Sequence, residues 1–230
     1  PVTMDQNSTV YGGDEGGNTD VNVGTMICKA ITMANNEVNW KDYDWNGDNE
    51  VEQVYIIYAG AGQATGGGAD TVWPHKYQVS AYAYTGFSPM DFNGVKVDVY
   101  ACSNEIGSSK QTAGIGTICH EFSHCLGLHD IYDTTYESGN WGMDYWDVMD
   151  QGNYAAEGYV PVGYSAYQRD FCGWRELVEI NTKGAYSMQP VEVQSTLILD
   201  IIKPTQKVGC LIHVHNFHKL VILYHTEYLS

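Results

Sequence analysis

Residues 120–130 read HEFSHCLGLHD, and the spacing of the histidines in this stretch decides the fold around it. His120 and His124 are four residues apart, so on a helix both imidazoles project from one face about one turn apart. At that spacing two neutral imidazoles can bind one Zn²⁺ ion, each at roughly 2.0–2.1 Å. Glu121 lies beside the first histidine, where its carboxylate can take a proton from a metal-bound water without binding the metal.

The HExxH pattern alone is a moderate signal, because an amphipathic helix with two hydrogen-bonded histidines would show it too. Three further residues favour the metal site. Gly127 can adopt a positive φ, end the helix and turn the chain back toward the metal. Asp130 then stands where a third ligand is required. Met149, in YWDVMDQGNY, follows at a distance that suits a methionine-containing turn beneath the site.

The extended pattern resembles that of the metzincin metallopeptidases, with Asp130 in place of the usual third histidine. An aspartate there is found in the immune inhibitor A-like (M6) family, which the chain resembles over about residues 10–190. The similar segments are GIGTICHEFSHCLGLHDIYD, DYDWNGDNEVEQVYIIYAG, TVWPHKY, VKVDVYACS, YWDVMD and GYSAYQRDFCGW. The resemblance implies a zinc-dependent endopeptidase with ligands His120, His124 and Asp130, base Glu121 and Met149 in the turn. Proteins or peptides would be its substrates, hydrolysed by a zinc-bound water that Glu121 activates.

One position departs from the family pattern. Family members usually carry proline just before the aspartate, whereas this chain has His129, which could compete for the metal and leaves the turn less rigid. We favour Asp130 as the ligand, because HDIYD keeps the aspartate at the family's position and a shift to His129 would shorten the loop.

The expected fold class is α+β, close to α/β: a metzincin-like twisted mixed sheet packed on two helices, with a smaller C-terminal subdomain. Hydrophobic periodicity predicts a helix from residue 21 to residue 34 with Asp20 as its N-cap, and further helices at 112–127 and 164–172. Strands are predicted at 51–60 and, at one rim of a sheet, at 95–102. Residues 1–19 are expected to be irregular.

The domain organisation expected from the sequence is a catalytic domain at 1–190 that lacks its N-terminal start. Residues 191–230 differ in charge and histidine content, and they are expected to form a β-rich appendage or an atypical tail.

An acidic stretch before the first strand suggests a second metal. Counted from Asp44, the loop places Asn46 and Asp48 at positions 3 and 5 of an EF-hand-like calcium site, with Glu52 as a late ligand. The glutamate usual at position 12 is missing, so a solvated acidic turn is the alternative. Two weaker candidates lie nearer the zinc motif. Tyr154 could place a phenol near the zinc to stabilise the tetrahedral oxyanion, with a packing role as the alternative, and Asp147 could orient the turn around Met149.

Composition limits the partners. The 230 residues carry 28 acidic and 11 basic side chains, a net charge of −17, which argues against nucleic acids and anionic membranes as partners. No stretch is apolar enough to span a membrane, and no signal peptide is visible. Of the six cysteines, Cys119 and Cys125 are expected to be buried free thiols. We expect a secreted, cell-surface or periplasmic bacterial protein. Its alternative function is that of a secreted metal-binding or surface protein without catalytic turnover.

Overall fold

The computed structural model describes residues 1–15, 20–86, 90–135, 137, 139–175, 177–179, 198–202 and 209–212. In this part of the chain the α-helices are α1 (Ser8–Tyr11), α2 (Val23–Ala34), α3 (Gly116–Cys125) and α4 (Ala166–Phe171). The strands are β1 (Val54–Ala61), β2 (His75–Gln78), β3 (Met90–Phe92), β4 (Val95–Val97), β5 (Val99–Ile106), β6 (Leu177–Glu179), β7 (Ile198–Ile202) and β8 (Gly209–Ile212). Short 3₁₀ helices are η1 (Trp40–Tyr43), η2 (Gln63–Thr65), η3 (Val79–Thr85), η4 (Asp144–Trp146) and η5 (Gln151–Gly158). The chain divides into two units, residues 1–162 and residues 163–230.

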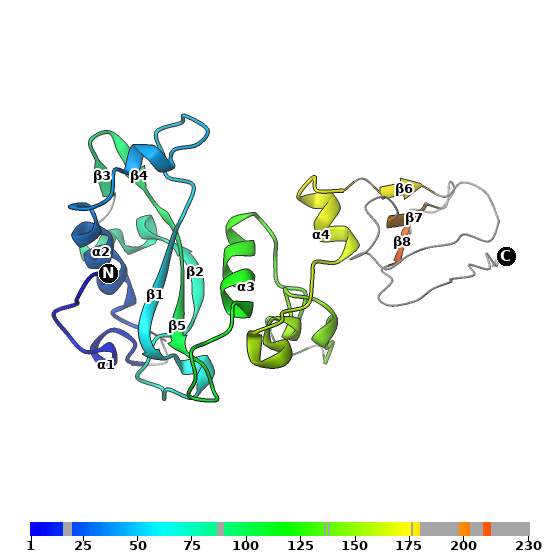
Figure 1. Cartoon of the computed structure of the whole chain (residues 1–230), viewed down its shortest axis with the longest axis horizontal. Helices are drawn as coiled ribbons and strands as arrows, with labels where there is room; N and C mark the ends of the chain where they lie inside the picture. The colour runs from blue at the N-terminus through cyan, green and yellow to red at the C-terminus, as the bar shows by residue number, and fades with distance from the viewer. Residues whose placement is uncertain are drawn as a thin grey trace. The chain divides into compact units, whose positions relative to one another are not determined.

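The main sheet of the first unit has the strand order β1-β5-β2. β5 runs parallel to β1, with Tyr100 opposite Val54, and antiparallel to β2, with Cys102 opposite His75. Helix α2 lies on one side of this twisted sheet and α3 on the other (Figure 1). A separate hairpin pairs β3 with β4. The fold is therefore mixed α/β, in agreement with the expected class.

The hydrophobic core lies between α2 and the sheet. Helix α2 forms where the sequence predicts it, because its apolar residues recur at helical spacing and Ile27 and Ile31 are fully buried against the strands. Its N-cap was wrongly predicted: Asn22 precedes the first helical residue, not Asp20. Asp20 has a φ of +50°, and its carboxylate accepts a hydrogen bond from the backbone N–H of Trp73 (3.0 Å). The carboxylate of Asp20 is therefore used in a long-range hydrogen bond and does not cap α2.

The segment predicted as one strand at 95–102 is two strands, β4 and β5. The break falls at Asp98, whose carboxylate accepts hydrogen bonds from the backbone N–H (2.7 Å) and the hydroxyl (3.0 Å) of Ser80. The expected place at a rim is also wrong, since β5 is central between β1 and β2. Residues alternate across the two faces of a strand. Tyr100 and Cys102 enter the core, while small residues on the other face leave room for α3, so the alternation does not mark a sheet edge.

The start of the chain is less irregular than expected, because residues 8–11 form the short helix α1. In the second unit, α4 confirms the predicted helix at 164–172. Its N-cap Ser165 accepts from the backbone N–H of Gln168, whose side chain accepts from the N–H of Ser165 (2.7 Å), a capping box.

The β6-β7-β8 sheet of the second unit places two strands beyond residue 191. The predicted domain boundary at residue 190 lies outside the described residues and stays a prediction. Over the part of the chain that the structure describes, no helix is long and apolar enough to cross a membrane.

Candidate metal centre

Helix α3 carries the two histidines, and its start is fixed by close packing on η5. A side chain at Gly116 would overlap the backbone carbonyl of Asn153, and one at Gly114 would overlap Gly158. The helix begins four residues later than predicted and keeps His120 and His124 on one face, where their rings meet edge to face with centroids 4.9 Å apart. His120 is buried and His124 is partly buried.

Gly127 ends the helix in the way the sequence predicts. Its φ is +89°, a region that glycine enters without steric cost. The N–H of Gly127 donates to the carbonyl of His124 (3.1 Å), and the N–H of Leu128 donates to that of Ser123 (3.1 Å). These two bonds are the Schellman arrangement, which reverses the chain at once after the last helical turn. The reversal brings Asp130 back to the histidines.

Each histidine is oriented by a backbone carbonyl. The Nδ1 atom of His120 lies 2.9 Å from the oxygen of Val148, and that of His124 lies 2.8 Å from the oxygen of Leu128. Because a carbonyl can only accept, both Nδ1 atoms must carry the proton, and the Nε2 atom of a neutral ring then holds a lone pair. This second hydrogen bond is the usual support of a metal-binding histidine.

Asp130 completes a three-residue group. Its Oδ1 atom lies 3.2 Å from Nε2 of His120 and 3.4 Å from Nε2 of His124, and the three ligand atoms lie within 4.8 Å of one another. This buried oxygen has no hydrogen-bond partner. The two Nε2 atoms and this oxygen all present lone pairs to one another. Lone pairs that face each other away from water repel, so a proton or a metal ion must lie between them. Two imidazoles and one carboxylate are ligands that suit zinc.

Without a metal, protons would take its place. Burial opposes the charged form of His120 and His124, but the nearby carboxylate of Asp130 outweighs it and raises the pKa of both rings. Burial would likewise raise the pKa of Asp130, yet the two histidines hold this pKa well below its usual range. Protons and metal therefore compete for the same two nitrogen atoms.

This competition predicts that metal affinity falls in acid. Below the raised histidine pKa values both rings must lose a proton to bind zinc, so the apparent dissociation constant should rise by up to about 100-fold per pH unit. Zinc affinity measured by chelator competition from about pH 8 to about pH 5 checks this. An affinity that stays constant over that range would contradict the proposed histidine ligands.

Glu121 is buried beside the group. Burial raises the pKa of its carboxyl to about 7, with a further upward contribution from Asp130, while the two histidines act in the opposite direction. A carboxyl with a pKa near neutrality can both accept and return a proton at the working pH, as a general base and acid must.

The turn at residues 147–150, which follows the ligands in the sequence, holds parts of the centre in place through hydrogen bonds. Asp147 accepts a hydrogen bond at Oδ1 from the N–H of the fully buried Met149 (2.8 Å), as the sequence suggests. The carbonyl of Val148 holds His120, and the carbonyl of Met149 accepts from the N–H of Ile131 (3.1 Å). One short turn thus contacts the first histidine and the residue after Asp130.

Sequence reasoning missed the carbonyl groups of Leu128 and Val148, since a backbone acceptor leaves no mark on residue type. It also missed Asp150, whose carboxylate accepts from the N–H groups of Met143 (2.8 Å), Asp144 (2.7 Å) and Gln151 (2.8 Å). An aspartate beside a turn is the signal that could have indicated this role.

Of the two weaker candidates, His129 is exposed and is not among the residues that gather around Asp130. Tyr154 lies in η5 and is exposed, and its role near the zinc stays a prediction. Cys119 and Cys125 are free thiols as predicted, although both are partly buried rather than buried.

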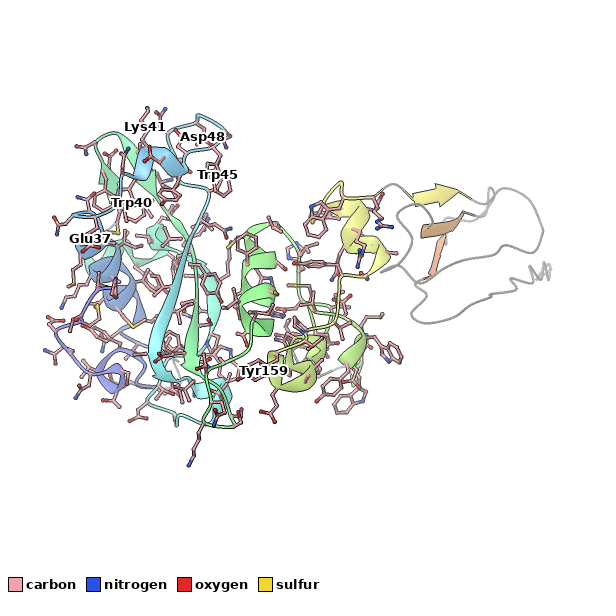
Figure 2. All side chains as sticks on the ribbon, in the orientation of Figure 1. Glu37, Trp40, Lys41, Trp45, Asp48 and Tyr159 are labelled. Carbon is pink, nitrogen blue, oxygen red and sulfur yellow. The ribbon has the colours of Figure 1, made fainter. Side chains whose placement is uncertain are left out.

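The proposed calcium ligands gain no support. Asp44 accepts hydrogen bonds from the N–H groups of Gly47 (2.9 Å) and Asn49 (3.2 Å), and Asp48 accepts from that of Glu50 (2.8 Å). Asn46 and Glu52 also accept from backbone N–H groups of the loop. Figure 2 shows Trp45 and Asp48 on this loop. Among the described residues, the only group of three or more histidine, cysteine or acidic ligands within metal-binding distance is the one on α3 and its turn.

Replacement of Gly127 tests the turn. An alanine there must adopt the left-handed conformation, so Gly127→Ala should lower the free energy of unfolding by about 1–2 kcal/mol. It should also weaken zinc binding, since the turn positions Leu128 and Asp130. Gly47→Ala is the matched control, with a φ of +81° and open space around it. Urea unfolding and zinc titration of both variants measure the two effects. Equal loss of zinc affinity in both would contradict the role of the turn.

A helix that presents HExxH, a glycine turn and a returning aspartate define the class of metallopeptidases. The chain belongs to the immune inhibitor A peptidase M6 family, whose catalytic domain it matches over residues 2–176. The resemblance seen in the sequence is thereby confirmed.

Two kinds of relative illustrate the match. Pre-pro-metalloprotease PrtV of Vibrio cholerae is 28% identical over 191 residues, which cover 72% of this chain and 20% of that protein. Immune inhibitor A of Bacillus thuringiensis subsp. alesti is 29% identical over 162 residues, 60% of this chain and 23% of that protein. The chain thus spans only about a fifth of the length of these relatives.

Proposed function

We propose that the chain is a zinc-dependent endopeptidase that hydrolyses peptide bonds of protein or peptide substrates. The observation that carries the proposal is the buried Oδ1 atom of Asp130, which has no hydrogen-bond partner and lies 3.2 and 3.4 Å from the histidine Nε2 atoms. Family membership supports it, because the matched region is the peptidase catalytic domain.

His120, His124 and Asp130 would hold the ion. When bound, zinc polarises the scissile carbonyl and makes water acidic enough to lose a proton near neutral pH. The carbonyls of Val148 and Leu128 keep the two rings in the tautomer that binds metal. The carboxylate of Asp130 supplies one negative charge, which leaves the ion with a net positive charge for catalysis.

Glu121 is the proposed general base. Its carboxylate takes the proton of the attacking water and then returns it to the amine that leaves. Burial keeps the pKa of its carboxyl at about 7, so near neutral pH the group can both accept and donate a proton. Gly127 and Met149 have supporting roles: the glycine turns the chain toward Asp130, and the turn around Met149 braces His120. These features, with the mixed sheet, agree with a metzincin-like arrangement.

We further propose that the protein acts outside the cytoplasm. One relative carries the name of a pre-pro-metalloprotease, and we expect the precursor segments in such a name to belong to a protein that is exported and processed. Export would also suit a general endopeptidase, because it separates the enzyme from the proteins of the cell that makes it.

Chelation tests the function as a whole. The zinc-loaded chain should cleave an unfolded protein substrate, lose this activity with a chelator and regain it when zinc is restored. Stoichiometric zinc without cleavage would instead favour the alternative, a metal-binding protein without turnover.

A further inference from the structure

The loop before the 147–150 turn exposes a group of aromatic side chains. Trp141 is 85% exposed, Trp146 62% and Tyr145 57%, and Met143 is also exposed. We call residues 141–146 the aromatic loop. Large aromatic side chains so accessible to solvent on one short loop are typical of a binding surface, because they offer contact area at little cost in conformational entropy.

The aromatic loop is fixed next to the metal centre. The N–H groups of Met143 and Asp144 donate to Oδ2 of Asp150, 2.8 and 2.7 Å away. A side chain at Gly142 would meet the carbonyl of Ile131 at 2.7 Å, so the loop packs directly on the residue that follows Asp130. Asp144 keeps a φ of +51°, which is uncommon for a residue other than glycine and often marks a functional site. The loop is therefore held in place before any ligand arrives.

The segment that carries the loop and the metal centre is strongly acidic. Residues 111–162 contain eight acidic residues and no lysine or arginine; the acids are Glu121, Asp130, Asp133, Glu137, Asp144, Asp147, Asp150 and Glu157. A divalent cation at the centre would still leave this segment with a formal net charge of −6, counted with every carboxyl group ionised. Such a field concentrates cations and repels anions, and an aromatic face attracts a cation further through its quadrupole.

We propose that the aromatic loop binds the side chain of a lysine or arginine of the polypeptide substrate, close to the bond that is cleaved. The inference rests on the proposed peptidase function and adds a preference to it. The aromatic faces would contact both the cationic head and the apolar stem of this side chain, while the negative charge of Asp144 attracts the head. An apolar substrate side chain would contact the aromatic faces but gain nothing from the negative charge. A cationic and an apolar side chain can therefore be distinguished by experiment.

The experiment compares pairs of quenched fluorescent peptides that differ at one position only. One member carries lysine and the other Nε-acetyl-lysine, which keeps the stem and removes the charge, and the position is moved along an otherwise neutral peptide. At the best position the wild-type chain should show a kcat/KM at least about fivefold higher for lysine. High salt should reduce this ratio, because the interaction is electrostatic.

Substitution of the loop identifies the residues responsible. In the variant with Trp141→Ala and Tyr145→Ala together, the ratio should fall toward one. Trp45→Ala is the matched control, since Trp45 is 72% exposed on another acidic loop of the same unit (Figure 2), and it should keep the wild-type ratio. Zinc content and thermal unfolding of each variant show that the centre is intact.

The outcomes are distinct. A wild-type ratio near one at every position, with both peptides cleaved, would overturn the cation preference and leave the peptidase proposal standing. A ratio that survives in the double variant would also overturn it, as would faster cleavage of the acetylated peptides. A zinc-loaded wild type that cleaves neither peptide nor an unfolded protein would reject the peptidase proposal itself.

Discussion

Glu121→Gln should reduce the cleavage of a protein substrate by at least about 100-fold while the chain keeps its zinc. Glutamine preserves the shape of the side chain but can neither accept nor return the proton of the attacking water. Because Glu121 is not one of the three residues that gather as ligands, its loss should leave the dissociation constant for zinc nearly unchanged. Initial rates on an unfolded protein and zinc content by elemental analysis give the two readouts.

Glu37→Gln is the control for this variant. Glu37 is exposed just beyond α2, the helix on the side of the sheet opposite α3 (Figures 1 and 2), so the same change of charge there should leave the rate unaltered. A Glu121→Gln variant that retains zinc and cleaves at the wild-type rate would remove Glu121 from the mechanism. Loss of zinc together with activity would show that Glu121 acts on the metal and not on the proton.

The second large effect is expected for Asp130→Ala, which removes one of three proposed ligands. Outer groups that only orient a ligand typically contribute 10–100-fold to metal affinity, so loss of a direct ligand should weaken zinc binding by at least about 100-fold. Activity should fall with it. Chelator competition at fixed pH measures the affinity, and assays at saturating zinc separate weak binding from a failure in catalysis.

His129→Ala is the decisive companion variant. His129 is exposed and lies outside the group around Asp130, so its removal should change the zinc affinity little. The two variants together separate the ligands that the sequence leaves open. Zinc retained in Asp130→Ala and lost in His129→Ala would reverse the assignment.

Much of the candidate centre could be predicted because its chemistry is local. His120, Glu121, His124, Gly127 and Asp130 lie within eleven residues, and helical spacing with one glycine turn is enough to bring them together. The structure adds what no spacing shows: the carbonyl groups that orient the two rings, and the buried oxygen of Asp130 without a partner.

The fold was less predictable where a long-range contact replaces a local preference. Asp20 has the residue type of an N-cap, but its carboxylate accepts a hydrogen bond from the backbone N–H of Trp73, and the residue before the first helical turn is Asn22, which makes no side-chain cap hydrogen bond. The alternation of 95–102 suggested a rim because polar residues usually face water, whereas Asp98 accepts hydrogen bonds from Ser80 and Tyr100 is buried in the core. The calcium motif fails for a different, local reason, since the carboxylates that match its positions accept hydrogen bonds from the backbone of their own loop.

The Gly127 turn has a consequence for the order of folding. All three proposed ligands come from α3 and the few residues after it, so bringing them together closes a very short loop and costs little chain entropy. The partners distant in sequence are the carbonyl of Val148, which orients His120, and η5, on which the start of α3 packs. The ligand set can thus assemble as soon as one helix and its turn exist, and an ion captured there would act as a nucleus on which the segment up to Asp150 later folds.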